Sequence, residues 1–136
     1  MIGIDTNVLV RYLAQDDPDQ SAVASQLFEH RLTAAHPGFI NVVAIAETAW
    51  VLERSYRLDG QGLAAVIERV LQADALVVQN EQEVFTSMIA LKEGRGSFAD
   101  ALIGAPGTAA GCSCTVTFDR KALRLSEFEA VQPASP

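Results

Sequence analysis

The sequence contains few cysteines, few basic residues and no long apolar run. Its two cysteines, Cys112 and Cys114, stand two residues apart, which matches neither the usual zinc pattern nor a thioredoxin-like motif. We therefore expect two free thiols. Lys and Arg total 10 against 17 Asp and Glu, for a net charge of -7. This balance argues against a general DNA-coating protein, which normally carries a basic face. It does not exclude a nucleic-acid substrate, because a bound metal ion can reverse the local field.

The sequence also shows no pattern typical of a membrane-spanning segment or of a secretory signal peptide. The apolar run that begins at Val42 meets Glu47 after Ala46, far short of the length that a bilayer requires. Residues 1–5 contain neither the basic n-region nor the apolar h-region of a signal peptide. We therefore expect a cytoplasmic protein that does not associate with membranes.

The composition of the 136 residues favours one folded domain. Hydrophobic residues make up 49% and charged residues 20%, which excludes wholesale disorder. We expect a single domain over residues 1–131 and a loose tail over 132–136, where proline, alanine and serine gather.

Short apolar segments alternate with segments of helical periodicity. Strands are predicted at residues 1–4, 37–40, 75–78, 114–118 and 128–132. Helices are predicted at residues 6–13, 18–28, 42–56, 63–71, 81–91 and 97–104. This alternation is typical of βαβ units, so we expect an α/β fold in which helices flank both faces of a central parallel sheet.

Local signals predict where several helices begin and end. Asp17 followed by Pro18, and Asn41 further along, are typical N-caps, and Asn80 with Glu83 forms a candidate capping pair. Pro106 is expected to break or kink the helix in which it lies. Trp50, in the third predicted helix, is expected in the core.

Two aspartates follow predicted strands. Asp5 comes just after the first strand and Asp119 just after the strand at 114–118. Binding sites in parallel sheets form at the carboxyl ends of strands, so the two carboxylates share one edge if their strands are neighbours. Asp is also a favoured N-cap, which is the structural alternative for each. The same alternative applies to Asp100, because Ser97-x-x-Asp100 before an apolar run resembles a capping box.

Glu47 is the only charged residue between Val42 and Leu52. It either forms a solvated stripe with Arg54 or points into a polar pocket. A carboxylate lodged among apolar residues needs a partner or a cation to remain charged.

Together, the four acids predict a cation site. Two carboxylates ~4 Å apart repel each other by about 4 kcal/mol at an intermediate dielectric constant, so a fold that gathers four of them requires a counter-charge. Oxygen ligands without nearby histidine or thiolate favour Mg²⁺ or Mn²⁺ over zinc.

These residues carry a resemblance to a known family. The sequence resembles PIN-domain ribonucleases, and among them the VapC-type toxins of toxin–antitoxin pairs. The similarity extends from residue 2 to about residue 131. It rests on IDTNVL at residues 4–9, Glu47, FADALI at 98–103 and TVTFDRK at 115–121.

The resemblance implies a three-layer PIN-like fold and a magnesium-dependent endoribonuclease, with Mn²⁺ as a substitute. By position, it implies that Asp5, Glu47, Asp100 and Asp119 form the catalytic, metal-binding quartet. It further implies that three polar residues orient these acids, namely Thr6, Asn7 and Thr117.

The same resemblance implies the reaction and the partners. The reaction is hydrolysis of an RNA phosphodiester, usually in a structured tRNA or rRNA. The metal would polarise the phosphoryl oxygen, while Glu47 or a second ion activates the attacking water. Ser97 stands where many relatives carry another acid, so the number of bound metal ions, one or two, stays open. The partners are a small antitoxin protein that occupies the active-site groove and a second copy of the toxin.

Basic residues flank the segments of Asp100 and Asp119. We expect them to contact RNA phosphates, and the alternative is an ordinary charged surface. They are Lys92, Arg95, Arg120, Lys121 and Arg124.

Other function classes match less well. A haloacid-dehalogenase-like phosphatase needs a second Asp two residues after the first, where Asn7 stands, and a phosphoreceiver domain needs an acceptor Asp where Gln79 follows the strand at 75–78. Two alternatives stay open: a PIN-like module that binds RNA or protein without turnover, and a nuclease for RNA processing or DNA cleavage rather than a toxin.

Overall fold

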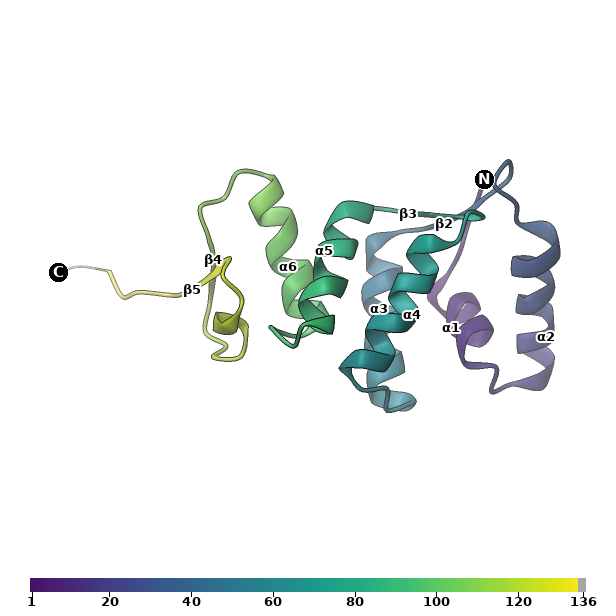
Figure 1. The fold of residues 1–136 in the computed structure, drawn as a ribbon, viewed down its shortest axis with the longest axis horizontal. Coiled ribbons are helices and arrows are strands. Elements are labelled where there is room, and N and C mark those ends of the chain that lie inside the picture. The colour runs from purple at the N-terminus through teal and green to yellow at the C-terminus, as the bar shows by residue number, and fades with distance from the viewer. Residues whose placement is uncertain (135–136) are drawn as a thin grey trace.

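The chain folds into an elongated α/β structure (Figure 1), seen in a computed structural model that describes residues 1–134. The strands are β1 (Ile2–Gly3), β2 (Gly38–Ile40), β3 (Leu76–Val78), β4 (Thr115–Thr117) and β5 (Phe128–Ala130). The helices are α1 (Thr6–Ala14), α2 (Pro18–Gln26), α3 (Val42–Ser55), α4 (Gly60–Gln72), α5 (Glu81–Lys92) and α6 (Phe98–Ala109). A π-helical turn, η1 (Leu27–Arg31), extends α2, and a short 3-10 helix, η2 (Ala122–Arg124), lies between β4 and β5. The predicted α/β class and the order of its elements are confirmed.

The five strands are divided between two sheets. β1, β2 and β3 form one sheet in that order, and β4 and β5 form the other. Every pairing is parallel, as predicted. The two sheets lie toward opposite ends of the long axis (Figure 1), with helices between them. β1 and β4 are therefore not neighbours within one chain, and the two sheets do not join into one.

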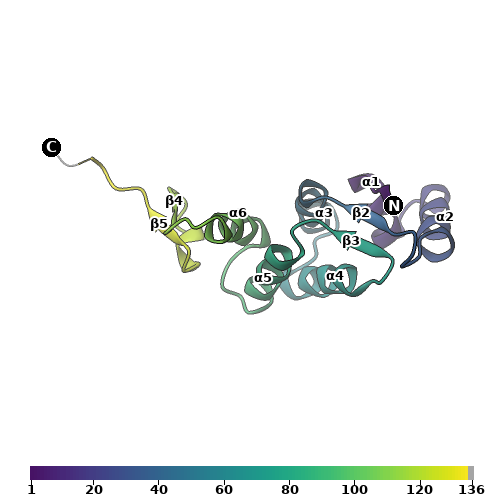
Figure 2. The same ribbon diagram turned by 90° about the horizontal axis from the view of Figure 1, so that it is seen from above.

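Helices α1, α3 and α4 lie on one side of the three-stranded sheet (Figures 1 and 2). On that side Ile4, Ile40 and Val78 are buried. The alternate residues point to the opposite face, where Gly3 is exposed, Phe39 is half-buried and Val77 is 41% exposed. Since parallel sheets are normally covered on both faces, this sheet has one face that lacks the expected cover.

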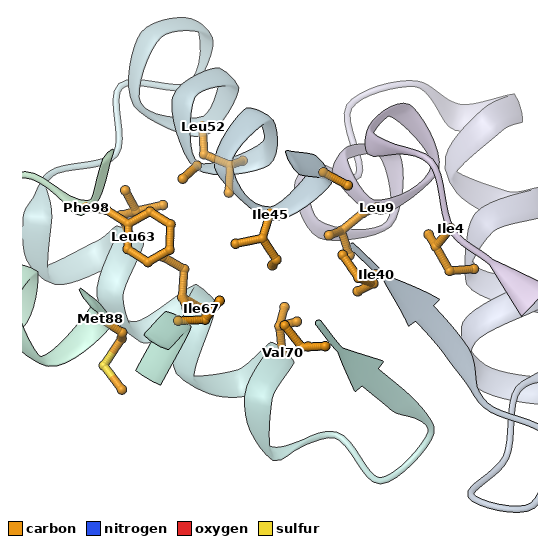
Figure 3. Close-up of a cluster of buried hydrophobic side chains, with 14 of the residues drawn as sticks. Ile4, Leu9, Ile40, Ile45, Leu52, Leu63, Ile67, Val70, Met88 and Phe98 are labelled. Carbon is orange, nitrogen blue, oxygen red and sulfur yellow. The ribbon is translucent and has the colours of Figure 1, made fainter. Parts of the chain in front are cut away.

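One large apolar cluster holds the N-terminal three-quarters of the chain together. Figure 3 shows its side chains converging from the sheet and from the surrounding helices. Ile40, Leu63 and Val84 are completely buried, from β2, α4 and α5. α6 joins the same cluster through Phe98 and Leu102. The core is thus built on one side of the sheet.

The C-terminal strands pack on α6 through a smaller cluster. It consists of Ala90, Ala101, Ala122, Leu125 and Phe128. Gly104 permits the close approach: a Cβ at this position would lie 2.8 Å from Phe128 Cε2 and 2.7 Å from Glu127 Cγ. Because α6 is anchored to the main core at Phe98, it carries β4 and β5 away from β1.

Most predicted helix starts are confirmed. Asp17 accepts hydrogen bonds from the N–H groups of Asp19 and Gln20, and Asn41 Oδ1 accepts from Ala44 N at 2.8 Å. The capping role predicted for Asn80 is wrong. Asn80 adopts a left-handed conformation (φ 54°, ψ 44°) and makes no side-chain cap bond, whereas capping requires an extended backbone.

Two other local expectations differ from the structure. α6 continues through Pro106 to Ala109, so the proline does not end the helix, and Pro106 lies in its last turn. Trp50 is 58% exposed rather than buried in the core. Its face of α3 turns away from the main cluster.

None of the helices in the described part of the chain is long and apolar enough to cross a membrane. Residues 132–134 form neither helix nor strand, and the last two residues of the expected tail lie outside the described range.

Candidate active site

Asp5 and Glu47 are joined through one threonine. Asp5 caps α1, with its Oδ1 accepting a hydrogen bond from Thr6 N at 2.9 Å. The Thr6 hydroxyl donates to Glu47 Oε1 at 2.6 Å. Thr6 is only 6% exposed, while both carboxylates are open to solvent. The contact fixes α3 to the carboxyl end of β1 and makes an Asp5–Thr6–Glu47 unit. Thr6 thus lies where an acid-orienting residue is expected.

Asp100 and Asp119 lie together on a different part of the surface. Ser97 Oγ accepts a hydrogen bond from Asp100 N at 3.0 Å, so the capping interpretation of Ser97 is confirmed. The backbone N–H of Asp119 donates to Thr117 Oγ1 at 2.9 Å, and Asp119 Oδ1 accepts from Lys121 N at 2.8 Å. Both aspartates line a cavity of ≈ 730 Å³ bordered by α3, α6 and the loop after β4.

Basic and aromatic side chains share this cavity with the two aspartates. Arg54, Lys121 and Arg124 contribute positive charge. The guanidinium of Arg54 lies 5.1 Å from the ring centroid of Trp50, which also lines the cavity. The sequence reasoning missed this pair, although Trp50 and Arg54 stand four residues apart, the spacing at which side chains meet on a helix.

The four acids do not form one group within the chain. Within residues 1–134, no three His, Cys, Asp or Glu side chains gather closely enough to hold a metal ion. The structure instead supplies two half-sites, the Asp5–Thr6–Glu47 unit and the Asp100–Asp119 cavity. Asn7, expected beside the acids, lines a separate cavity of ≈ 550 Å³ between α1 and α2.

The five basic residues expected to bind RNA fall into three groups. Lys121 and Arg124 line the aspartate cavity, and Arg124 also donates to Gly94 O at 2.7 Å. Lys92 forms an ion pair with Glu68 at 3.5 Å, and Arg95 one with Glu93 at 3.1 Å. Arg120 is exposed beside Asp119.

The cysteines are free, as predicted, with Cys112 exposed and Cys114 half-buried. Desolvation and the nearby Glu129 carboxylate raise the pKa of the Cys114 thiol. A raised pKa disfavours the thiolate, which is the form that would act as nucleophile or metal ligand. Cys114 therefore gives no support to thiol chemistry at this site.

Comparisons with known proteins place this arrangement in a family. The model of the PIN domain family matches residues 2–128, nearly the whole chain. A protein of Aquifex aeolicus (strain VF5) named VapC ribonuclease is 23% identical over 130 residues, which cover 96% of this chain and 95% of that protein. The predicted resemblance to PIN domains, and to their VapC type, is confirmed.

Proposed function

Because the chain belongs to the PIN domain family, we propose that it is an endoribonuclease that hydrolyses RNA phosphodiester bonds with Mg²⁺, for which Mn²⁺ substitutes. The observation that carries this proposal is the position of Asp5 and Glu47, two exposed carboxylates linked by Thr6 at the end of β1. Acids at the carboxyl end of a parallel strand stand where α/β proteins bind their ligands.

The chemistry of the acids agrees with a hard divalent cation, because all four offer only carboxylate oxygens. Their distribution does not: each half-site of a single chain supplies two acids, and no third acid joins either. When bound, such an ion would neutralise negative charge on the phosphate.

The chain's own residues can accept a proton and bind the RNA. Glu47, oriented by the Thr6 hydroxyl, can accept a proton from water. Lys121 and Arg124 can bind phosphates, and the exposed ring of Trp50 offers a surface for base stacking. In this proposal Asp100 and Asp119 complete the acidic set.

The similarity to a protein named VapC ribonuclease supports a toxin role. We propose that the chain is the toxin of a toxin–antitoxin pair, that it cuts structured tRNA or rRNA in the cytoplasm, and that a small antitoxin covers its groove. Its second partner is another copy of the chain.

Calorimetric titration of Mn²⁺ into the purified chain at neutral pH tests the metal part without knowledge of the substrate. Asp5→Asn and Asp100→Asn are each expected to weaken binding at least tenfold, because each removes a ligand charge. Asp74→Asn, a change at an exposed acid outside both half-sites, should leave binding unchanged. No binding by the folded wild type would favour a PIN-like module that binds RNA or protein without turnover.

Expression in a host cell separates the nuclease roles. A toxin is expected to arrest growth and to cut a few structured RNAs, and the Asp119→Asn variant should do neither. RNA cleavage without growth arrest would instead indicate a processing nuclease, and cleavage of DNA alone would contradict the proposed substrate.

A further inference from the structure

β1 has one unpaired edge that is ready to accept a strand. Ile2 N donates to Pro37 O at 3.1 Å and Ile4 N to Phe39 O at 2.8 Å, so these residues face β2. Because backbone groups alternate along a parallel strand, Gly3 turns its N–H and C=O to the other edge. Among residues 1–134, no strand pairs there. Ile2 is 45% exposed beside this edge.

β4 has the complementary unpaired edge. Thr115 N donates to Glu127 O at 2.8 Å, and Thr117 O accepts from Val131 N at 3.2 Å, so both threonines face β5. Val116 and Phe118 therefore turn their backbone groups outward. Their side chains are 61% and 90% exposed. An isolated two-stranded sheet is marginally stable in water, and parallel sheets are normally covered on both faces. Within the described residues, the β4–β5 sheet thus lacks a neighbouring strand beside β4, and only its α6 face is covered.

The two edges match in one parallel register. If Gly3 pairs with Thr117, Gly3 N meets Val116 O and Phe118 N meets Gly3 O, which are the groups left open on each side. Side-chain rows then agree as well, with Ile2 beside Val116 and Ile4 beside Phe118. One step further, Asp5 lies opposite Asp119, on strands roughly 4.8 Å apart.

The faces match in the same register. α6 covers the β4–β5 face that holds Thr115, since a Cβ at Gly107 would lie 3.1 Å from Thr115 Oγ1. That face continues the uncovered side of the larger sheet, which holds Gly3 and Val77. The exposed side chain of Phe118 falls on the core side. In the joined sheet, the face of β4–β5 that α6 covers therefore continues the uncovered face of the three-stranded sheet. On the other side, the covered face of the three-stranded sheet continues the uncovered face of β4–β5.

A chain in this conformation cannot make the pairing with itself, because its own β4 lies at the opposite end of the molecule from β1 (Figures 1 and 2). We propose that two copies exchange these edges: β4 of each copy joins β1 of the other in a reciprocal dimer with one five-stranded sheet per half. Asp5 and Glu47 of one copy then share a site with the partner's Asp119. The pairing rests on the strand edges alone, whereas the shared metal site rests on the proposed function.

Cross-linking tests the pairing independently of any activity. Ile2→Cys in one chain and Val116→Cys in another, both with Cys112 and Cys114 replaced by serine, are mixed, unfolded and refolded. They are then treated with a bifunctional thiol-reactive cross-linker (a bis-electrophile that alkylates one cysteine at each end) that spans one strand spacing. A covalent dimer is expected. Glu129→Cys is the matched control, because Glu129 is the register partner of Val116 on β5 and lies one strand further away. It should not cross-link to Ile2→Cys.

The same reagent distinguishes the competing arrangement. A chain that carries both cysteines should give cross-linked dimers, not an internal link. An internal link in the double variant, or no dimer from the mixture, would show that each chain closes on itself or stays open, and would overturn the proposal.

Light scattering provides a second readout. Phe118→Lys is expected to convert a dimer into a monomer of 14.6 kDa, since it places a charge in the new sheet, and its 90% exposure means that the monomer should still fold. Val23→Lys, at a 73% exposed position on α2, should leave the dimer intact. The reverse result would move the interface to α2 and contradict the edge exchange.

Mixing two defective variants tests the shared site. Asp5→Asn and Asp119→Asn, refolded together, form heterodimers in which one of two sites keeps both acids. With random pairing, about one quarter of the wild-type Mn²⁺ sites should return. No recovery, in a mixture that still cross-links, would reject the shared site but not the dimer. If wild-type protein binds no Mn²⁺, the proposed function fails, while the cross-link still decides the pairing.

Discussion

The hydroxyl of Thr6 donates to Glu47 across 41 residues of sequence, at 2.6 Å. This one contact orients Glu47, the one candidate site acid that lies in the middle of a helix, and ties it to the residues that follow β1. Thr6 therefore acts on the site through two neighbours: its N–H donates to Asp5 and its hydroxyl donates to Glu47.

Replacing Thr6 with valine removes the hydroxyl and keeps the shape. The free energy of unfolding should fall by about 1–2 kcal/mol, because a buried hydrogen bond to a charged acceptor is lost. Mn²⁺ affinity should fall about tenfold as Glu47 loses its orientation. Denaturant unfolding and calorimetry measure the two effects. Thr86→Val, which removes an exposed hydroxyl bonded to Gln82 O within α5, is the control. Equal affinities for Thr6→Val and wild type would contradict the orienting role.

Removing the ring at Trp50 should weaken RNA binding. Stacking of a base on an aromatic side chain contributes about 1–3 kcal/mol, so Trp50→Ala should raise the dissociation constant for a single-stranded oligonucleotide by a factor of about 5 to 150. Fluorescence anisotropy measures it, with metal omitted to prevent cleavage. Phe85 is a second exposed aromatic residue, on α5 rather than α3. The Phe85→Ala variant should bind as tightly as wild type. If both variants lose affinity equally, Trp50 has no specific role.

Tyr56 should control the pH dependence of stability. Its hydroxyl donates to Asp16 Oδ2. This hydrogen bond lowers the pKa of Asp16 below its ordinary 3.8 and raises the pKa of Tyr56 above 10.0. The Asp16 contribution is therefore complete above pH 3.8 and lost as pH falls through the lowered value. The Tyr56 contribution is complete below pH 10.0 and lost as pH rises through the raised value.

Tyr56→Phe should consequently lower the thermal midpoint between these limits, and the difference from wild type should shrink at both ends. Thermal unfolding across pH measures it. Tyr12→Phe, which removes the hydroxyl of a tyrosine whose ring stacks on Phe28, is the control. A constant difference for Tyr56→Phe at all pH values would contradict the assignment.

Gly104→Ala should loosen the C-terminal sheet. The added methyl group would lie 2.7 Å from Glu127 Cγ and 2.8 Å from Phe128 Cε2, so β5 must move off α6. Such overpacking costs about 1–3 kcal/mol, more than the ~1 kcal/mol that alanine returns as a better helix former. Limited proteolysis should cut the chain near β4 sooner. Gly60→Ala, whose Cβ would lie an ordinary 3.4 Å from Leu91 Cδ1, should not increase cleavage there.

The sequence predicted the features that depend on neighbouring residues. Three of these features are local hydrogen bonds: the caps at Asp17 and Asn41 and the contact between Ser97 and Asp100. The side-chain types and their spacing in the sequence are enough to predict such bonds. Asn80 differs because its left-handed backbone is set by the turn after β3, and a side-chain type does not reveal that conformation.

Long-range pairing was less predictable. The strand segments before Asp5 and Asp119 have similar patterns, and nothing in either segment records which edge it joins. The anchoring of α6 at Phe98 decides where β4 is placed, and that depends on the packing of the whole core. Trp50 is exposed although apolar residues flank it in sequence, because its face of α3 turns away from the main cluster.

Within one chain, β4 and β5 are held to α6 by a cluster of only five residues, and this lowers the free energy needed to open them. Regions that bury little apolar surface open locally, at a lower free energy than the whole domain, and their amide hydrogens exchange with solvent first. β2, which crosses the large cluster, and β4, which rests on the small one, therefore belong to separate cooperative units. Asp119, two residues after β4, belongs to the second unit. This opening alone separates Asp119 from Asp100, with which it shares a cavity, while the helices that hold Glu47 and Asp100 remain folded.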